Sequence, residues 1–154
     1  MNIVNIGSTA NICDGFVYSN NRFIGYALTN EPAKRCQINL GSVIDRMQVL
    51  NNFACYPKLL ADKAWLIQYD TFDMTNVLVK GNMGFKPNTS TTDGSMMNGS
   101  ATACSGLVID NYDWHIDGTG LLIKLGTKLG FANNFSSIAG AADRSMQISP
   151  LLAA

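Results

Sequence analysis

Short runs of alternating apolar and polar residues recur along the chain, and this period of two predicts β-strands. The clearest run places Trp65, Ile67 and Tyr69 on one face of a single strand. The pattern at residues 42–50 fits either a strand or a helix. Further strands are predicted at residues 3–6, 36–40, 77–79, 107–116 and 121–125.

Turn-forming residues between the runs predict two hairpins and one short helical segment. The polar turn at residues 19–21 joins two apolar runs and predicts a hairpin over residues 16–28. Asp117-Gly118 follows the strand predicted at 107–116, and Asp-Gly between apolar runs is a strong hairpin signal. The segment 57–63 begins with proline, which is favoured at the first helical position, and predicts one or two helical turns.

The spacing of these segments indicates the fold class. Roughly seven to nine short strands at about ten-residue spacing are typical of a β-sandwich or jelly roll. A chain of 154 residues fits one domain, and the sequence indicates neither a linker nor an internal repeat. We therefore expect an all-β fold, a β-sandwich or jelly roll with short helical turns, forming a single domain over residues 1–154.

The composition adds to this picture a weakly charged surface. The chain has one Glu, ten Asp and sixteen Asn, and charged residues make up 14% of it. An ordinary soluble domain has about 25% charged residues. The surface is therefore wetted mainly by neutral side chains, and we expect much of it to be covered by other subunits.

Charge and hydrophobicity exclude several classes of partner. The net charge is zero and the chain has no basic stripe, so nucleic acid is not expected as the main partner. The longest apolar runs are far too short to cross a bilayer, so no membrane is expected as a partner. The N-terminus lacks the basic region and long apolar run of a signal peptide, which predicts synthesis in the host cytoplasm.

Four cysteines lie far apart in the sequence. Zinc ligands usually occur as close pairs such as C-x₂-C, and the chain has no such pair. We therefore predict free thiols that pack as small apolar groups, and neither a metal nor another cofactor. A reducing compartment would also oppose disulfides. The cysteines are Cys13, Cys36, Cys55 and Cys104.

The segment from Asp113 to Gly118 has oxygen-bearing residues at alternate positions before a glycine, as at the start of a calcium loop. The match then fails, because His115 replaces an oxygen ligand. Lys124 stands where a bidentate glutamate would close the site, and its charge would repel calcium. A hairpin turn at Asp117 is the favoured interpretation.

A cysteine hydrolase is a further hypothesis that the residue types allow. His115 is the single histidine, and Cys104 is the candidate nucleophile. Asp110, Asp113 or Asp117 would be the third member. The favoured alternative is that Asp113, His115 and Asp117 form the polar outer face of a hairpin.

Two further residue sets would suit carbohydrate chemistry. Asp70 and Asp73 are a carboxylate pair of the kind that glycoside hydrolases use, although two aspartates near a strand end are more typical of a turn. Aromatic residues offer stacking faces for sugars, although packing in the core is the favoured interpretation. The aromatic residues concerned are Trp65, Tyr69, Tyr112 and Trp114.

Three segments are predicted to contact other subunits. The polar stretch 86–102 is long for a loop and contains an apolar pair, Met96 and Met97. The N-terminal residues 1–6 and the uncharged, apolar residues 149–154 are the other two. Packing of these segments against the chain itself is the alternative. The contact residues predicted in the terminal segments are Met1, Ile3, Pro150, Leu151 and Leu152.

The Glu-poor surface rich in Asn, Ser, Thr and Gly, the glycine-punctuated strands and the apolar C-terminal segment resemble accessory structural proteins of tailed bacteriophages. The nearest group is the decoration or cement proteins of the capsid. The resemblance implies a β-rich fold, frequently trimeric, that sits on the outer capsid and clamps neighbouring capsid proteins. The chain departs from that group in its four cysteines and in lacking an extended N-terminal arm.

The function expected from this resemblance is that of a non-enzymatic virion protein that stabilises an assembly. Its expected partners are copies of itself, as in a trimer, and a major capsid protein or another virion protein. Contacts of modest strength would add through avidity. The alternative prediction is a carbohydrate-binding jelly-roll module of a phage tail.

Overall fold

The computed structural model describes residues 4–7, 12–24, 36–55, 64–86, 95–99, 103–115, 123–124 and 128–137. Within these ranges all regular secondary structure is β-strand. In chain order the strands are β1 (Val4–Ile6), β2 (Cys13–Asp14), β3 (Val17–Ser19), β4 (Arg22–Ile24), β5 (Ile38–Leu40), β6 (Ile44–Asp45), β7 (Gln48–Leu50), β8 (Phe53–Cys55), β9 (Ala64–Asp70), β10 (Met74–Thr75), β11 (Val77–Lys80), β12 (Met83–Lys86), β13 (Ser95–Gly99), β14 (Ser105–Ile109), β15 (Tyr112–His115), β16 (Ile123–Lys124), β17 (Lys128–Ala132) and β18 (Phe135–Ser137).

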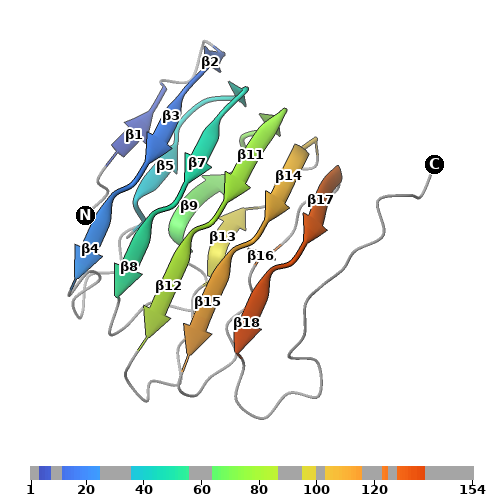
Figure 1. The fold of residues 1–154 in the computed structure, drawn as a ribbon. Coiled ribbons are helices and arrows are strands. Elements are labelled where there is room, and N and C mark those ends of the chain that lie inside the picture. The colour runs from blue at the N-terminus through green and yellow to red at the C-terminus, as the bar shows by residue number, and fades with distance from the viewer. Residues whose placement is uncertain are drawn as a thin grey trace.

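The strands form four sheets, and every strand pairing in the described ranges is parallel. Sheet A has the order β1-β5-β9-β13-β16 and sheet B the order β2-β6-β10. Sheet C has the order β3-β7-β11-β14-β17 and sheet D the order β4-β8-β12-β15-β18. Sheets C and D appear as two adjoining rows of arrows, with sheet A behind them (Figure 1). The described ranges therefore form a parallel β-solenoid of five coils.

The prediction of mostly β structure is confirmed, but the β-sandwich or jelly roll is wrong, because those folds consist of antiparallel strands. The predicted hairpins are wrong for the same reason. β3 pairs with β7, and β4 pairs with β8, so the two strands around residues 19–21 do not pair with each other. β15 belongs to sheet D and β16 to sheet A. The helical segment predicted at 57–63 lies outside the described residues.

One residue in the left-handed conformation bends the chain between sheets C and D in every coil. Asn, Asp and Gly adopt positive φ at the lowest cost, which explains their use at this position. The bend directs the chain into the next sheet without reversing it, so the neighbouring coil supplies the pairing partner. The five residues are Asn20 (φ 58°), Asn51 (54°), Gly81 (67°), Asp110 (56°) and Asn133 (52°).

An asparagine follows each bend residue, and the pair is an internal repeat, contrary to the sequence-based expectation. The intervals between successive asparagines are 31, 30, 29 and 23 residues. Coils of unequal length and only two shared positions per coil conceal the repeat in the sequence. The asparagines are Asn21, Asn52, Asn82, Asn111 and Asn134.

A second bend lies between sheets B and C. Gly15 (φ 73°), Arg46 (51°) and Asn76 (53°) occupy it in the first three coils. The Arg46 guanidinium donates hydrogen bonds to the Asp14 carboxylate and lowers the pKa of that group. Thr75 and Asn76 donate to the Asp45 carboxylate at 2.7 and 2.9 Å and lower its pKa. Polar contacts between coils therefore fix this edge of the solenoid.

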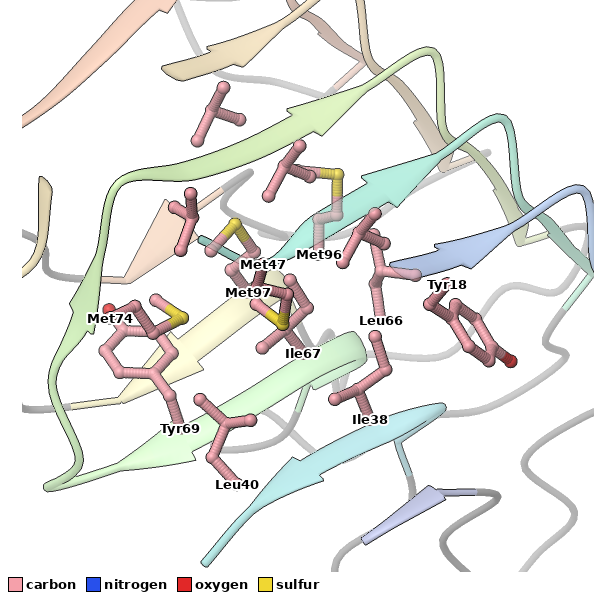
Figure 2. Close-up of a cluster of buried hydrophobic side chains, with 14 of the residues drawn as sticks. Tyr18, Ile38, Leu40, Met47, Leu66, Ile67, Tyr69, Met74, Met96 and Met97 are labelled. Atoms are coloured by element: carbon pink, nitrogen blue, oxygen red, sulfur yellow. The ribbon is translucent and has the colours of Figure 1, made fainter. Parts of the chain in front are cut away.

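The core fills the space between the sheets with long aliphatic, aromatic and methionine side chains (Figure 2). The strand predicted from Trp65, Ile67 and Tyr69 is confirmed as β9, and all three side chains are fully buried. Gly84 of β12 makes room for the indole, because a Cβ there would lie 2.6 Å from ring atoms of Trp65. Further fully buried residues are Ile38, Leu40, Ile44, Met47, Val49, Leu66, Met74 and Val79.

Met96 and Met97 do not lie in an exposed loop. They belong to β13, and neither side chain is exposed. Both side chains belong to the buried core cluster, next to an irregularity in the pairing of β13 with β9 (Figure 2). Side chains in the chain's own core are not accessible to a neighbouring subunit, and the predicted contact through these two residues does not fit their position. The other predicted contact residues, Met1, Ile3, Pro150, Leu151 and Leu152, lie outside the described residues.

Candidate protein-binding face

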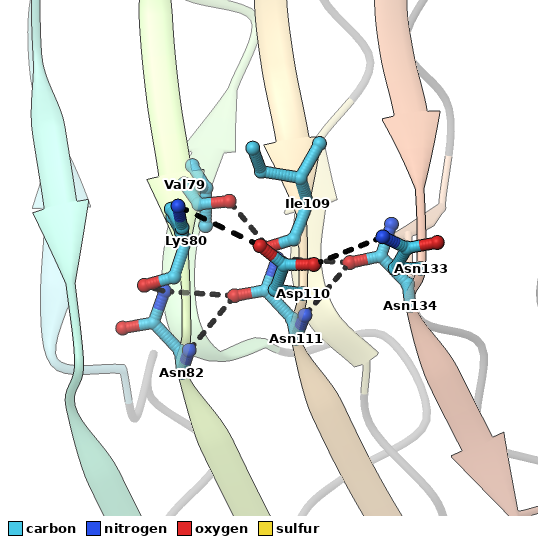
Figure 3. A network of polar contacts seen from close by, with 8 residues as sticks. All are labelled: Val79, Lys80, Asn82, Ile109, Asp110, Asn111, Asn133 and Asn134. Carbon is cyan, nitrogen blue, oxygen red and sulfur yellow. Dashed lines mark hydrogen bonds and ion pairs between the residues drawn. The ribbon is translucent and has the colours of Figure 1, made fainter.

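A ladder of buried asparagine side chains runs along the bend between sheets C and D. In each coil the Nδ2 group donates to the Oδ1 atom of the asparagine in the next coil, at 2.9 Å in all four steps. The backbone N–H of the donor asparagine shares the same acceptor, at 2.9–3.0 Å. Figure 3 shows the steps from Asn82 to Asn111 and from Asn111 to Asn134.

The ladder also ties each coil to the one before it. Asn82 donates from Nδ2 to the Val49 carbonyl at 2.9 Å, and Asn111 donates to the Val79 carbonyl at 2.9 Å. The ladder therefore holds the strands of sheet D at one register. Because alternate residues point to the same face, the first and third residues after each ladder asparagine point outward wherever their side chains are described.

These outward positions form two rows of mostly apolar side chains on sheet D, which we call the apolar face. The register pairs members of a row directly with one another. The first row contains Arg22, Phe53, Met83, Tyr112 and Phe135, and the second contains Ile24, Cys55, Phe85 and Trp114.

The aromatic rings of the apolar face pack against one another along the solenoid axis. The rings of Tyr112 and Phe135 stack with centroids 4.7 Å apart and an interplanar angle of 13°. The rings of Phe85 and Trp114 lie 5.1 Å apart at 58°. The stacked rings of Tyr112 and Phe135 each cover one face of the other, so that face is not open to a sugar. The surface is therefore better suited to packing against another protein than to stacking on a sugar ring.

Exposed apolar side chains are concentrated on this side of the molecule. Of the eight exposed large apolar side chains in the described ranges, five lie on sheet D, including Ile24 (70% exposed), Met83 (45%) and Trp114 (40%). Val17 and Leu107 are also exposed, on the neighbouring sheet C. Contiguous apolar patches of more than a few hundred Å² are rare on soluble monomers and mark interaction sites.

Charge is sparse on the described part of this surface. The Arg22 guanidinium lies 5.3 Å from the centre of the Phe53 ring, so it packs as part of the first row. Lys80 and Asp110 form an exposed ion pair with 3.7 Å between Nζ and Oδ2 (Figure 3). The Nδ2 group of Asn133 donates to Asp110 at 3.2 Å.

The four aromatic residues considered from the sequence divide between core and surface. Trp65 and Tyr69 are buried, whereas Tyr112 and Trp114 belong to the apolar face. Sequence reasoning missed the remaining members of the face, including Phe53, Phe85 and Phe135. Their common signal is position: each lies one or three residues after a ladder asparagine.

The geometry around Cys104 does not favour a cysteine nucleophile. Cys104 is buried, and burial raises the pKa of its thiol, whereas reactive cysteines have a lowered pKa. Asp113 is buried and points inward, since a Cβ on Gly84 would lie 2.8 Å from its Oδ1 atom. Asp113 therefore does not contribute to the predicted polar outer face. His115 ends β15, and its side chain lies outside the described part of the structure, as does Asp117.

The remaining hypotheses concern a carboxylate pair, the state of the cysteines and a metal site. The Asp73 carboxylate accepts a hydrogen bond from the backbone N–H of Ala103 at 3.1 Å, in keeping with a turn residue. All four cysteines are free; Cys36 and Cys104 are buried, as expected of thiols that pack as small apolar groups, whereas Cys13 and Cys55 are partly exposed. Among the described residues, no group of three or more His, Cys, Asp or Glu side chains is arranged to hold a metal ion. The same residues include no helix long and apolar enough to span a membrane.

Comparison of the chain with family models, curated proteins and solved structures gave no match.

Proposed function

We propose that the chain is a non-enzymatic structural protein of a virion that binds a neighbouring protein subunit through the apolar face of sheet D and the adjoining part of sheet C. The observation that carries this proposal is the concentration of exposed apolar side chains on that surface. The low charge of the chain supports the same role, because a surface with few ionic groups loses little hydration when it is covered.

The ladder makes the apolar face suitable for binding. Strands held at one register by buried hydrogen bonds lose little backbone freedom when a partner docks. The partner expected is a protein with a flat apolar surface. The resemblance of the composition to capsid decoration proteins supports a position on the outer capsid, with contacts to a major capsid protein and to copies of this chain.

The carbohydrate-binding alternative would use Trp114, whose ring is tilted relative to Phe85 and 40% exposed. The stacked pair Tyr112 and Phe135 favours the protein partner, since each ring already covers one face of the other. For this reason we propose the protein partner alone.

Replacing Met83 by lysine is expected to weaken binding to virus particles that lack this protein. The side chain is 45% exposed in the middle of the first row, so a charge there must be desolvated when a partner covers it. The folded chain should keep its thermal stability, because an exposed substitution changes stability by about 0.5 kcal/mol or less. Co-sedimentation of the purified variant with such particles measures the effect.

Thr71→Lys is the matched control, because Thr71 is exposed on the turn after β9, away from sheet D. It should co-sediment as well as the unaltered chain. Equal binding of Met83→Lys and Thr71→Lys would contradict the assignment of the apolar face as the interface.

A further inference from the structure

The two ends of the asparagine ladder differ in their hydrogen-bonding groups. Asn134, at the last coil, is 1% exposed; its Oδ1 accepts from Asn111, and one Nδ2 hydrogen goes to the Val108 carbonyl at 2.7 Å. Its backbone N–H and its second Nδ2 hydrogen find no acceptor among the described residues. Asn21, at the first coil, donates to Asn52, while its own Oδ1 accepts no hydrogen bond from the described residues. The ladder thus has a donor end and an acceptor end.

The bonds between neighbouring coils specify what would satisfy these ends. Asn111 donates from its backbone N–H and from Nδ2 to the Oδ1 atom of Asn134, at 3.0 and 2.9 Å. The backbone N–H of Asp110 donates to the Ala132 carbonyl at 3.1 Å. In the opposite direction, the backbone N–H of Phe135 donates to the Asn111 carbonyl at 2.8 Å. A coil that follows Asn134 therefore needs an asparagine with a free Oδ1, a carbonyl two residues before it and an N–H one residue after it.

The first coil of the same chain has all three groups in the required order. The Oδ1 atom of Asn21 matches the donors of Asn134. The carbonyl of Ser19, two residues earlier, matches the backbone N–H of Asn133. The backbone N–H of Arg22, one residue later, matches the carbonyl of Asn134. Residues 138–154 contain no asparagine, so that stretch of sequence does not supply a sixth ladder residue.

The outward side chains fit the same arrangement. One face of the Phe135 ring stacks on Tyr112, and Phe135 is 37% exposed. Within the chain Arg22 covers the ring of Phe53 in the next strand of the row. Arg22 of a second copy, placed one coil beyond Phe135, would cover that ring in the same way.

We propose that a second copy of this chain docks head-to-tail, with its first coil on the last coil of the first copy, and that the asparagine ladder continues across the interface. A head-to-tail contact of this kind does not close on itself, so it produces a linear stack. Each copy of five coils adds about 24 Å, at about 4.8 Å per coil. This association uses the ends of the solenoid, including Arg22 and Phe135 at the two ends of the first row, and leaves the outward surface of the apolar face uncovered.

Replacing Arg22 by proline tests the proposal. Arg22 begins β4, the edge strand of sheet D, and its backbone N–H points away from β8, since Phe53 donates to the carbonyl of Asn21 instead. Proline is tolerated on an edge strand where its N–H would face outward. The substitution thus removes a donor of the proposed interface and none of the hydrogen bonds between described residues. Arg22→Ala is the matched control, because it keeps the N–H.

Sedimentation velocity of the purified chain over a series of concentrations measures the association. We expect the unaltered chain and Met83→Lys to associate, Arg22→Ala to associate more weakly, and Arg22→Pro to remain a monomer. Electron microscopy of the unaltered chain should show rods whose lengths increase in steps of about 24 Å. A monomer at every concentration, rings or side-by-side pairs, or equal association of Arg22→Pro would overturn the proposal. Thermal unfolding verifies that Arg22→Pro is folded. If this variant does not fold, the proposal is tested by the rod lengths of the unaltered chain.

Discussion

Replacing Asn82 by leucine is expected to lower the free energy of unfolding by about 5 kcal/mol, which is close to the whole stability of many domains. Asn82 sits in the third of five coils and is fully buried. Without its side chain, the backbone N–H and Nδ2 of Asn52 lose their acceptor, and the Val49 carbonyl loses a donor. Each polar group left buried without a partner costs about 1–3 kcal/mol.

Gln48→Leu is the matched control, since it also replaces an amide by leucine but on the exposed outer face of β7. It should change the free energy of unfolding by about 0.5 kcal/mol or less. Urea unfolding followed by circular dichroism measures both variants. Similar midpoints for the two would mean that the ladder does not stabilise the solenoid.

Replacing Gly106 by alanine is the second change with a large expected effect, a loss of about 4 kcal/mol. Gly106 has φ 135°, and a Cβ there would lie 2.1 Å from the carbonyl oxygen and 2.5 Å from the nitrogen of Val77. Both atoms belong to the backbone of the paired strand β11. The clash can be relieved only by separating β11 from β14, which lie in the middle of sheet C.

Gly15→Ala separates the effect of backbone conformation from that of crowding. Gly15 also has positive φ (73°), but no heavy atom lies within 4 Å of its virtual Cβ. Its replacement should cost about 1–2 kcal/mol, the penalty of the left-handed conformation alone. Thermal unfolding of the two variants compares them, and a Gly106 variant as stable as the Gly15 variant would contradict the tight pairing of β11 and β14.

Several of the strands could be predicted from the sequence, whereas the way they pair could not. The alternation of apolar and polar residues predicts the strand at Trp65, Ile67 and Tyr69 whether the neighbouring strands are parallel or antiparallel. The polar turn at residues 19–21 carries the signal of a hairpin, but its left-handed Asn20 bends the chain by only part of a reversal. Hydrogen bonds to the next coil, about thirty residues away, decide whether such a turn forms a hairpin or a bend. Local sequence patterns carry no information about a partner so distant in the chain.

The same limit applies to the candidate site. Trp65 and Trp114 both lie in alternating runs, yet one is in the core and the other is on the apolar face. The outward position of Trp114 follows from its place three residues after the ladder asparagine Asn111, whereas Trp65 lies in β9 of sheet A, which does not directly follow a ladder asparagine. The polar residues that flank Met96 and Met97 predict a loop, but both residues lie in β13, which pairs with β9. The weak charge of the surface could be recognised from composition alone.

The reactivity of Cys55 tests most directly whether the apolar face is covered in an assembly. Cys55 is a free, half-buried thiol in the second row, between Ile24 and Phe85. Thiol labelling followed by peptide mass spectrometry reports it separately from the other cysteines, and Thr71→Cys provides a control thiol away from sheet D. We predict that Cys55 is labelled in the isolated chain and protected in assembled particles, while the control reacts equally in both. Equal labelling of Cys55 in the two states would contradict the account.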